Sequence, residues 1–595
     1  MILVFGGTTE GRKAVEVLEE AGRAYYYSTK TGEQDITMYN GLRIDGALDG
    51  EAMQALCQEH DIRLIVDAAH PFASQLHQTI AQVSGSLNIP TIRYERIFPP
   101  RDSSITWIDD YSQVPTDIHS LLVTTGVQSI SKLKPLETLG VKVYYRILNR
   151  ESSIALALKQ GASEEQLCFF NDPKDISIDA EAILLKESGL SGGFPEKVEA
   201  AKARGMKVIA LKRPECSDPH QTSLWGGFGH SPSGEMERDL VNGPYGLRRA
   251  VEKLLPEFYP LHSGLTTGTC ATAAAVAATL QLCKGEMPDE VPVMLSNSET
   301  IMVSVGYGDD YAYCVKEAGD DPDVTNGIEI RARVKPSETF EILGGEGVGT
   351  FTLPGFDYPP GEPAINKAPR EMIRQNIEQL SIVNSQLSIT ISVPQGAEIA
   401  KRTFNPRLGI EGGISIIGVS GIVKPFSEEA FIDSIRKCMT VAQASGAERV
   451  VINSGGKSER FVKALYPDLP QQAFVEYGNY IGETLKIAAE LDIKNVTLGV
   501  MLGKAVKLAA GHLDTHSRKA TMDKTFIQQM LHEANCDIDI SSITLARELW
   551  EELPPEKLQT FATTIIRHCA VHCSPLLPNG TLTILLIDDE GTIYQ

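Results

Sequence analysis

The stretch that most constrains this protein is KRTFNPRLGIEGGISIIGVSGIVKP, residues 401–425. Five glycines stand among isoleucines and valines, behind a basic, turn-rich start. Runs of β-branched residues favour a buried strand, whereas glycines allow a close backbone approach or a turn with positive φ. A buried strand with a bulge and a tight turn is the simpler interpretation, and a backbone that approaches a ligand is the alternative.

Downstream of this stretch, helix and strand patterns alternate. We expect a helix over 428–444 and strands over 449–453, 473–476 and 496–501, each strand followed by a polar or glycine-containing loop. Such βα repetition predicts a mostly parallel sheet whose loops gather at one edge.

Upstream, residues 262–275 form a turn rich in hydroxyls and glycine that leads into an alanine-rich helix. Thr266, Thr267 and Thr269 are candidate caps, and free amides at that helix start would attract a carboxylate or a phosphate. Asp320 and Asp321 belong to an acidic cluster that could bind a cation or act as a base. A polar turn capped by Asp is an equally good explanation.

The N-terminus predicts a β-turn-α-β unit, with strands at 2–5 and 24–27 and a helix over 12–21. Glycines and hydroxyls lie where a helix N-terminus can hold phosphate, although the spacing is not G-x-G-x-x-G and an ordinary α/β turn is the alternative. The candidate cofactor-binding residues here are Gly6, Gly7, Thr8, Thr9 and Glu10.

The end of the second strand reads Ser28-Thr29-Lys30, where an NAD-preferring site usually carries an acid. Two hydroxyls and a cation suit a 2′-phosphate, so these three residues favour NADPH over NADH.

Further α/β units follow. Residues 64–73 are expected to form a strand, a turn and a helix start, with strands at 89–96, 182–186 and 207–211 and a helix over 195–203. The first of these strands leads to His70, which is either a catalytic candidate or a packed turn residue. Arg93 and Arg96 lie on the strand at 89–96. They are either substrate ligands or charged residues of a solvated strand edge. We therefore expect the N-terminal region to be a pair of Rossmann-like α/β subdomains that face one another across their loops.

Several motifs of residues 1–215 resemble the precorrin-6A reductase family of corrinoid biosynthesis: GGTTEGR, DAAHPFA, IRYER, KESGLSGGFPEKVEAAK and KRPE. The resemblance implies hydride transfer from NADPH to a double bond of the macrocycle. The chain departs from the family pattern at Gly126-Val127 and at Asn171-Asp172-Pro173, both in loops of the expected cleft.

After residue 215 the composition changes to Gly, Ser, Pro and His, so we expect a linker over 216–257 that includes a short helix at 247–255. The second region then spans 258–595, with subdomains at 258–400 and 401–595.

In that region GLTTGTCATAAA, AGDDPDVTNG, GGEGVGTFTLPG, GEPAINKAPREMI and the opening stretch, continued to KPFS, resemble the cobalt-precorrin-5B C1-methyltransferase family. The resemblance implies methyl transfer from S-adenosylmethionine to a carbon of the macrocycle. Asn453, Gly455, Gly456 and Glu476 are candidates for holding this donor, with ordinary βα turns as the alternative.

A tetrapyrrole substrate with many carboxylates calls for cationic and hydrogen-bonding partners. The expected substrate-binding residues are Arg93, Arg96, Thr266, Thr267, Lys401, Arg402, Arg407, Gly412 and Gly413. His516 joins His70, Asp320 and Asp321 as a catalytic candidate. His512, Asp514 and His516 resemble a metal-ligand set, but hydrogen bonding to substrate carboxylates or structural capping is the favoured interpretation. Cobalt already belongs to the substrate in this picture, so we expect no protein-bound metal.

The charge and cysteine content narrow the function further. A net charge of -22 argues against non-specific nucleic-acid binding. Ten cysteines spread along 595 residues do not form a disulfide scaffold, and neither a signal peptide nor a membrane-spanning stretch is evident, so we expect a soluble, cytoplasmic protein, with a homo-oligomer left open.

A bifunctional enzyme that carries out consecutive steps is the main hypothesis. A methyltransferase fused to a catalytically silent corrinoid-binding scaffold is the alternative. A nucleotide-sugar enzyme is disfavoured because its Tyr-x-x-x-Lys helix is not apparent.

Overall fold

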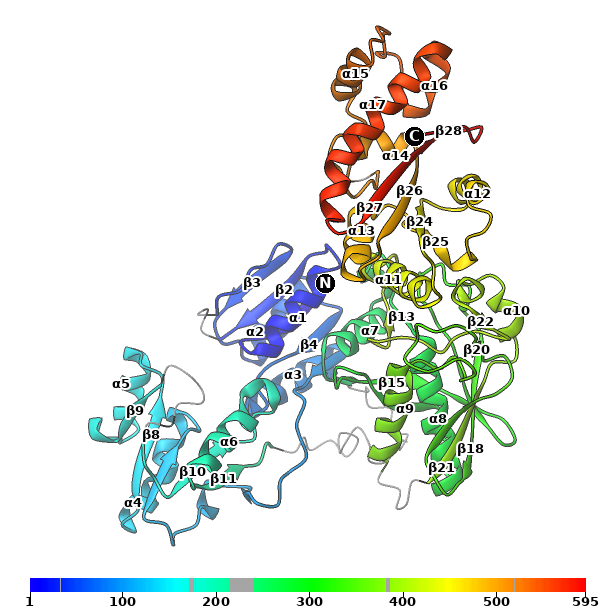
Figure 1. The fold of residues 1–595 in the computed structure, drawn as a ribbon. Helices are drawn as coiled ribbons and strands as arrows, with labels where there is room; N and C mark the ends of the chain where they lie inside the picture. Colours follow the sequence, from blue (N-terminus) through cyan, green and yellow to red (C-terminus); the bar gives the residue numbers. More distant parts are fainter. Residues whose placement is uncertain are drawn as a thin grey trace.

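The computed structural model describes every residue except 31, 33, 171–175, 177, 215–238, 381–385 and 518. Over the described residues, the chain builds four bodies (Figure 1). Two lie in the N-terminal region, one is built mainly from residues 263–425, and one from residues 427–595.

The first body is a parallel sheet covered by helices on both faces. Its strand order is β12-β5-β4-β1-β2-β3. The strands are β1 Ile2–Phe5, β2 Tyr25–Thr29, β3 Gly41–Asp45, β4 Leu64–Asp67, β5 Thr91–Tyr94 and β12 Asp239–Val241, and the helices are α1 Thr9–Glu19, α2 Gly50–Glu59, α3 Ser74–Leu87 and α7 Pro244–Leu254. Because side chains alternate along a strand, Ile2 and Val4 pack with α1 and α7, while Leu3 and Phe5 pack with α2 and α3.

The second body repeats this plan, with the parallel order β6-β11-β10-β7-β8-β9. Its strands are β6 Thr106–Ile108, β7 Ser120–Val123, β8 Lys142–Ile147, β9 Leu167–Phe169, β10 Ala182–Lys186 and β11 Lys207–Leu211, and its helices are α4 Ile130–Thr138, α5 Glu151–Lys159 and α6 Phe194–Ala203. Every strand pair in both sheets is parallel, which confirms the expected pair of Rossmann-like subdomains.

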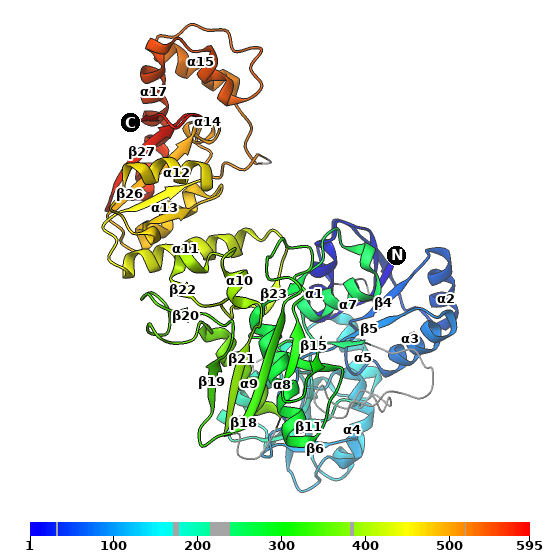
Figure 2. The same ribbon diagram turned by 90° about the vertical axis from the view of Figure 1, so that its right-hand side faces the viewer.

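Part of the expected linker is structural. Residues 216–238 of it lie outside the described residues, but β12 pairs with β5, and α7 packs its Leu247 and Val251 into the first core. Helix α7 also contacts β15 (Thr300–Ser304) of the third body, so it joins the two regions (Figure 2). The helix was expected, but the return of this part of the chain to the first sheet was not. The pairing of β12 with β5, far away in sequence, leaves no local signal.

The third body contains a five-stranded sheet of order β16-β17-β18-β21-β19, in which only the β19–β21 pair is parallel. The parallel pattern expected for the C-terminal region therefore does not extend to this body. Its remaining elements are β13 Gly264–Leu265, α8 Thr267–Lys284, β14 Glu290–Met294, β16 Gly306–Tyr307, β17 Ala312–Val315, β18 Glu329–Pro336, β19 Glu341–Gly344, β20 Thr350–Phe351, α9 Lys367–Gln379, β21 Leu387–Ser392, α10 Gly396–Ala400, β22 Ile410–Glu411 and β23 Ile422–Val423.

Helix α8 lies at the centre of the third body. The alanine-rich run from Ala271 to Ala278 is buried, and it packs against β17, β18 and α9. Small side chains let the helix approach the sheet closely, as the sequence suggested.

The 401–425 stretch is not one strand. It consists of the 3-10 helix η6 Asn405–Leu408, the two-residue strands β22 and β23, and turns between them. Its middle runs beside two earlier segments, with isolated bridges from Ile414 to Val348 and from Ile416 to Ile365. A Cβ on Gly413 would lie 2.1 Å from the Gly347 carbonyl oxygen, so only glycine allows this approach.

The fourth body is a sheet of order β25-β24-β26-β27-β28, parallel except for the β27–β28 pair, which confirms the expectation for this part. Its elements are α11 Glu428–Ala444, β24 Val450–Asn453, α12 Gly456–Leu465, β25 Phe474–Glu476, α13 Ile481–Glu490, β26 Asn495–Met501, α14 Leu502–Ala509, α15 Lys524–Glu533, α16 Leu549–Glu552, α17 Pro555–Cys573, β27 Thr581–Ile587 and β28 Ile593–Tyr594.

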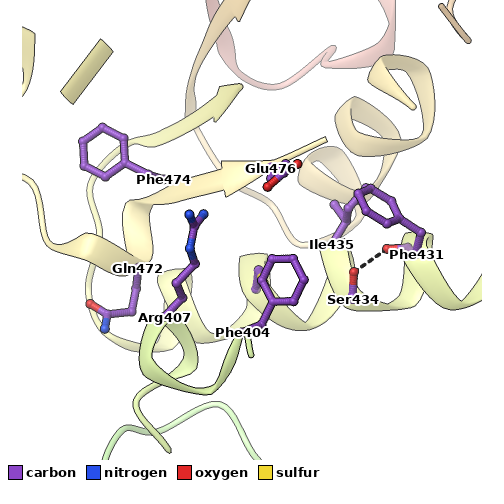
Figure 3. Close-up of a pocket in the computed structure, with 9 residues that line it drawn as sticks. Phe404, Arg407, Phe431, Ser434, Ile435, Gln472, Phe474 and Glu476 are labelled. Atoms are coloured by element: carbon purple, nitrogen blue, oxygen red, sulfur yellow. Dashed lines mark hydrogen bonds between the residues drawn. The ribbon is translucent and has the colours of Figure 1, made fainter. Parts of the chain in front are cut away.

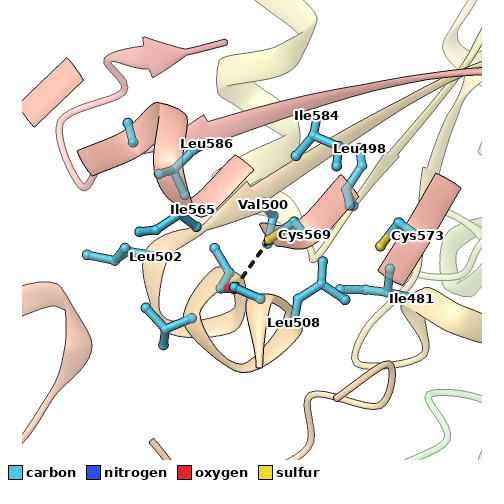
Figure 4. Close-up of a cluster of buried hydrophobic side chains, with 14 of the residues drawn as sticks. Ile481, Leu498, Val500, Leu502, Leu508, Ile565, Cys569, Cys573, Ile584 and Leu586 are labelled. Carbon is cyan, nitrogen blue, oxygen red and sulfur yellow. Dashed lines mark hydrogen bonds between the residues drawn. The ribbon is translucent and has the colours of Figure 1, made fainter. Parts of the chain in front are cut away.

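Helix α17 supplies the largest part of this body's helical cover. Ile565, Cys569 and Cys573 point from it into the core formed by β26 and β27 (Figure 4). The Cys569 thiol donates to the Ala505 carbonyl at 3.4 Å, and burial raises the pKa of Cys573 to about 12. These cysteines are core residues.

Candidate functional site

The glycine turn after β1 is closed by a tyrosine of the next strand. Thr8 caps α1, because its hydroxyl accepts from the Gly11 amide at 2.9 Å and donates to the Ala68 carbonyl at 2.6 Å. The Gly7 amide donates to the Tyr27 hydroxyl at 3.0 Å, and a Cβ on Gly6 would collide with that same hydroxyl. Tyr27 is thus part of the turn, although no local pattern indicates this.

One side of the turn stays open. Gly7 is exposed with φ +82°, and no atom lies within 4 Å of the position that a Cβ would take there. Thr9, at the first position of α1, is partly buried.

One of the predicted 2′-phosphate contacts, Thr29, meets an unpredicted acid, Asp45 of β3. Ser28 and Thr29 are buried, and the Thr29 hydroxyl donates to Asp45 at 3.0 Å, while Lys30 is exposed. Arg43 forms an ion pair with Asp45 at 2.9 Å, and this pair lowers the pKa of that carboxyl. The edge therefore offers two exposed cations, Lys30 and Arg43, beside one carboxylate.

Both predicted substrate arginines are engaged by acids of the chain. Arg93 lies 2.9 Å from Asp67 and 3.0 Å from Glu95. Arg96 lies 2.8 Å from Glu10, and both of these side chains are 6% exposed. Glu10, predicted to hold a cofactor, instead forms a buried ion pair.

This ion pair joins the two N-terminal bodies. Arg96 also donates to the Ser188 carbonyl at 2.8 Å, and the Ser191 hydroxyl donates to Glu10. Ser188 and Ser191 belong to the loop after β10, within the motif KESGLSGGFPEKVEAAK. The structure thus brings the loops of the two sheets together, as predicted.

His70 lies at the same junction and is held neutral. Its Nδ1 accepts from the Phe72 amide at 3.2 Å. Burial lowers the pKa of His70 to about 3, helped by the nearby cations Arg96 and Lys186. The imidazole is therefore uncharged at neutral pH and can offer a hydrogen bond, but it is a poor source of protons.

A buried histidine that the sequence analysis missed supports this loop. His77 of α3 lies 2.7 Å from Asp67 through Nδ1 and 3.0 Å from the His70 carbonyl through Nε2. Its spacing of seven residues from His70 could have drawn attention to it.

In the third body, the predicted threonines hold the 401–425 stretch in place. Thr266 caps α8 and packs against Gly418, and the Thr267 hydroxyl accepts from the Ile417 amide at 2.8 Å. Gly412 has φ +82° with open space beside it. The stretch therefore lies across the start of α8.

The acidic candidates serve as turn caps. Asp320 accepts from the His262 amide at 2.7 Å, and Asp321 accepts from the Phe426 amide at 3.1 Å. The His516 amide donates to Asp514 at 3.0 Å, and Asp514 pairs with Lys519.

A small pocket lies where the third and fourth bodies meet (Figure 3). Arg407 and Phe404 reach it from the region of η6, and Glu476 stands at the carboxyl end of β25. The lining comprises Phe404, Arg407, Phe431, Ser434, Ile435, Cys438, Gln472, Phe474 and Glu476. Of the residues predicted as substrate ligands, Arg407 lies here, whereas Lys401 and Arg402 are exposed and outside the lining.

The electrostatics of this pocket centre on two acids. Arg407 pairs with Glu459 of α12 at 2.8 Å, and Lys463 pairs with the same carboxylate at 2.6 Å. Burial raises the pKa of Glu476, with Arg407 opposing the effect and Glu459 adding to it. No ion-pair partner lies within 4.0 Å of Glu476 among the described residues, so its carboxylate is available to a ligand.

The four donor candidates come together at this edge of the sheet. Asn453 and Glu476 are register partners on β24 and β25. The Asn453 amide group is used internally, by the Gly455 amide at 3.1 Å and the Val475 carbonyl at 3.3 Å. Gly455 has φ +144°, and a Cβ there would lie 3.3 Å from a Glu476 carboxylate oxygen, while Gly456 faces open space. Of the four, Glu476 is the side chain that faces both the turn and the pocket.

Across the described ranges, no set of three or more His, Cys, Asp or Glu side chains is arranged to hold a metal ion. None of the helices in the described part of the chain has the length and apolar character needed to cross a bilayer.

Comparison with known proteins divides the chain at α7. Residues 1–225 match the family model for precorrin-6x reductase CbiJ/CobK, and residues 256–425 match the model for CbiD. A cobalt-precorrin-5B C(1)-methyltransferase of Prosthecochloris aestuarii is 40% identical over 345 residues, which covers 55% of this chain and 94% of the relative. The chain belongs to the CbiD family.

A second CbiD relative, the cobalt-precorrin-5B C(1)-methyltransferase of Brucella anthropi, is 45% identical over 285 residues, covering 46% of this chain and 77% of the relative. A solved CobK precorrin-6A reductase is 16% identical with a TM-score of 0.32, and it covers 43% of this chain and 96% of that structure. The two family-model matches and the sequence relatives support the fusion that the motifs predicted, with α8 and the 401–425 stretch both inside the CbiD match.

Proposed function

We propose that this protein is a bifunctional enzyme of cobalamin biosynthesis. In this proposal the CbiD part methylates C1 of cobalt-precorrin-5B, and the N-terminal reductase part reduces the resulting cobalt-precorrin-6A. The observation that carries it is the occurrence in one chain of matches to two families, at residues 256–425 and 1–225.

We propose that S-adenosylmethionine binds beside the pocket of Figure 3. When bound, it supplies an activated methyl group, so the chain needs to position the reactants and exclude water more than to provide acid or base. An unpaired, partly buried carboxylate at Glu476 and aromatic faces at Phe404 and Phe431 suit a cationic donor. Gly455 and Gly456 keep the adjoining turn open, and Asn453 fixes its shape.

We propose that NADPH binds at the carboxyl edge of the first sheet. When bound, it supplies the hydride. The open side of Gly7, at the start of the eleven-residue helix α1, fits a phosphate, and the exposed cations Lys30 and Arg43 fit a 2′-phosphate. Asp45, which pairs with Arg43, would have to release it for that contact.

We also propose a cellular compartment and an oligomeric state for this protein. A reducing compartment such as the cytoplasm is in keeping with nine described cysteines that are all free. Association into a homo-oligomer stays a proposal, to be checked by light scattering.

The test is an anaerobic incubation of the full chain with cobalt-precorrin-5B and S-adenosylmethionine, with and without NADPH, followed by mass spectrometry. We expect one added methyl group without NADPH and two further hydrogens with it. Methylation without reduction would favour the silent-scaffold alternative, which the departure at Val127 motivates. Asn171, the other departure, lies outside the described residues. Absence of methylation would refute the proposal.

A further inference from the structure

The arginines expected to bind the substrate of the reductase part are already occupied. Arg93 is paired with two carboxylates at 3.0 Å or less, and Arg96 is buried against Glu10. Breaking a buried pair leaves an uncompensated charge, which is strongly unfavourable. Substrate carboxylates therefore need other cations at this junction.

Two lysines of the second body meet that need. Lys186 ends β10, and its Nζ lies 4.9 Å from the ring centre of Phe72, which comes from the first body. Lys197 lies on α6, and its Nζ donates to the Gly192 carbonyl at 2.9 Å. Both side chains are partly buried, and within the described ranges neither has a carboxylate partner at ion-pair distance.

Their surroundings concentrate positive charge. Burial lowers the pKa of Lys197 to about 8, and Arg146 and Arg96 add to the effect. Burial also lowers the pKa of Lys186, with a contribution from Lys132. Uncompensated cations in a partly desolvated place are costly until an anion arrives.

The position of the two lysines agrees with a substrate site. The carboxyl ends of parallel strands are where open α/β sheets bind ligands, and Lys186 occupies such an end, facing the loop that carries His70 and Phe72. Ammonium groups act as compact charges that suit single flexible carboxylates.

Building on the proposed reductase function, we propose that Lys186 and Lys197 bind carboxylate side chains of the macrocycle at the junction of the two N-terminal sheets. Arg93 and Arg96 then hold the loops in place without touching the substrate. Lys186 and Lys197 both lie within the motif KESGLSGGFPEKVEAAK, but nothing local distinguishes them from Lys202 of the same motif.

The experiment compares Lys186→Met and Lys197→Met with Lys202→Met in the full chain. Lys202 lies on the same helix as Lys197 but points to the surface, where it pairs with Asp102 at 2.6 Å. We measure binding of cobalt-precorrin-6A anaerobically from its absorption spectrum without NADPH, and we measure KM for both substrates in turnover.

Each of the first two variants should weaken cobalt-precorrin-6A binding about 10- to 100-fold, the range for losing one charged hydrogen bond. KM for NADPH should stay unchanged, and Lys197→Arg should recover part of the loss. Equal binding by Lys186→Met, Lys197→Met and Lys202→Met would overturn the assignment, as would failure of the unmodified chain to bind the substrate. Binding without reduction would refute the reductase function alone, while the binding constants still decide the role of the lysines.

Discussion

The buried ion pair between Glu10 and Arg96 offers a direct test of how the N-terminal bodies are joined. Replacing Arg96 by Met leaves the Glu10 carboxylate, 6% exposed, with only the Ser191 hydroxyl, and it removes the donor to the Ser188 carbonyl. Removing one partner of a buried pair costs about 3–5 kcal/mol. We expect the free energy needed to open the junction to fall by that amount.

Hydrogen–deuterium exchange read by mass spectrometry measures this opening at the junction itself. Since about 1.4 kcal/mol is a tenfold change in an equilibrium constant, protection of peptides from 9–19 and 187–203 should fall by about 100-fold to several thousand-fold. A second change, Glu10→Gln in the Arg96→Met background, removes the stranded charge and should restore at least half of the lost free energy.

Arg12→Met is the matched control, because Arg12 lies on α1, the helix that carries Glu10, but its side chain is exposed. Its effect should stay within about 0.5 kcal/mol. The reasoning fails if Arg96→Met exchanges like Arg12→Met, or if the double variant is no more protected than Arg96→Met alone.

Three further outcomes are expected. Gly413→Ala should destabilise the third body by about 3 kcal/mol or more, since its Cβ would meet the Gly347 carbonyl oxygen at 2.1 Å. Gly85→Ala, on α3 of the first body, places its Cβ in open space and should not destabilise the protein. Thermal denaturation compares the two variants. Glu476→Gln should weaken S-adenosylmethionine binding about tenfold by calorimetry, and an unchanged Kd would remove Glu476 from the site. The lowered pKa of His70, about 3, means that the unfolded chain takes up a proton below about pH 6.5 that the native chain refuses, so stability is lost as pH falls through that window, by at most about 1.4 kcal/mol per pH unit. His70→Gln should flatten this loss in exchange measurements between about pH 7 and about pH 5, and an identical slope would contradict it.

The local sequence pattern was sufficient to predict the bounds of an element where buried residues follow one another along the chain. The strands at 2–5, 182–186 and 207–211 and the helix at 428–444 have the expected bounds, because buried parallel strands are uninterrupted apolar runs and the helix begins at a capping serine, Ser427. The convergence of Asn453 and Glu476 also followed, since parallel strands end at one edge of a sheet.

Pairings between distant segments could not be predicted in the same way. Arg96 meets Glu10 across 86 residues, and β12 returns to the first sheet after the whole second body. An arginine in IRYER has the same local sequence whether it lies on a solvated strand edge or in a buried ion pair. Whether it is available to a substrate could therefore not be judged from the sequence. The same holds for Lys186 and Lys197: that neither has a carboxylate partner within the described residues depends on what lies near them in space, and their local sequence does not show it.

The sequence by itself determined that two α/β units with glycine turns precede a CbiD-like region, because turns, caps and apolar periodicity are encoded within a few residues. Only the tertiary structure decided which charges are already paired and where the 401–425 stretch lies, since its glycines fit against Gly347 and Thr266, far away in sequence. Electrostatic pairing and close backbone approach depend on distance in space, and short-range sequence does not specify that distance.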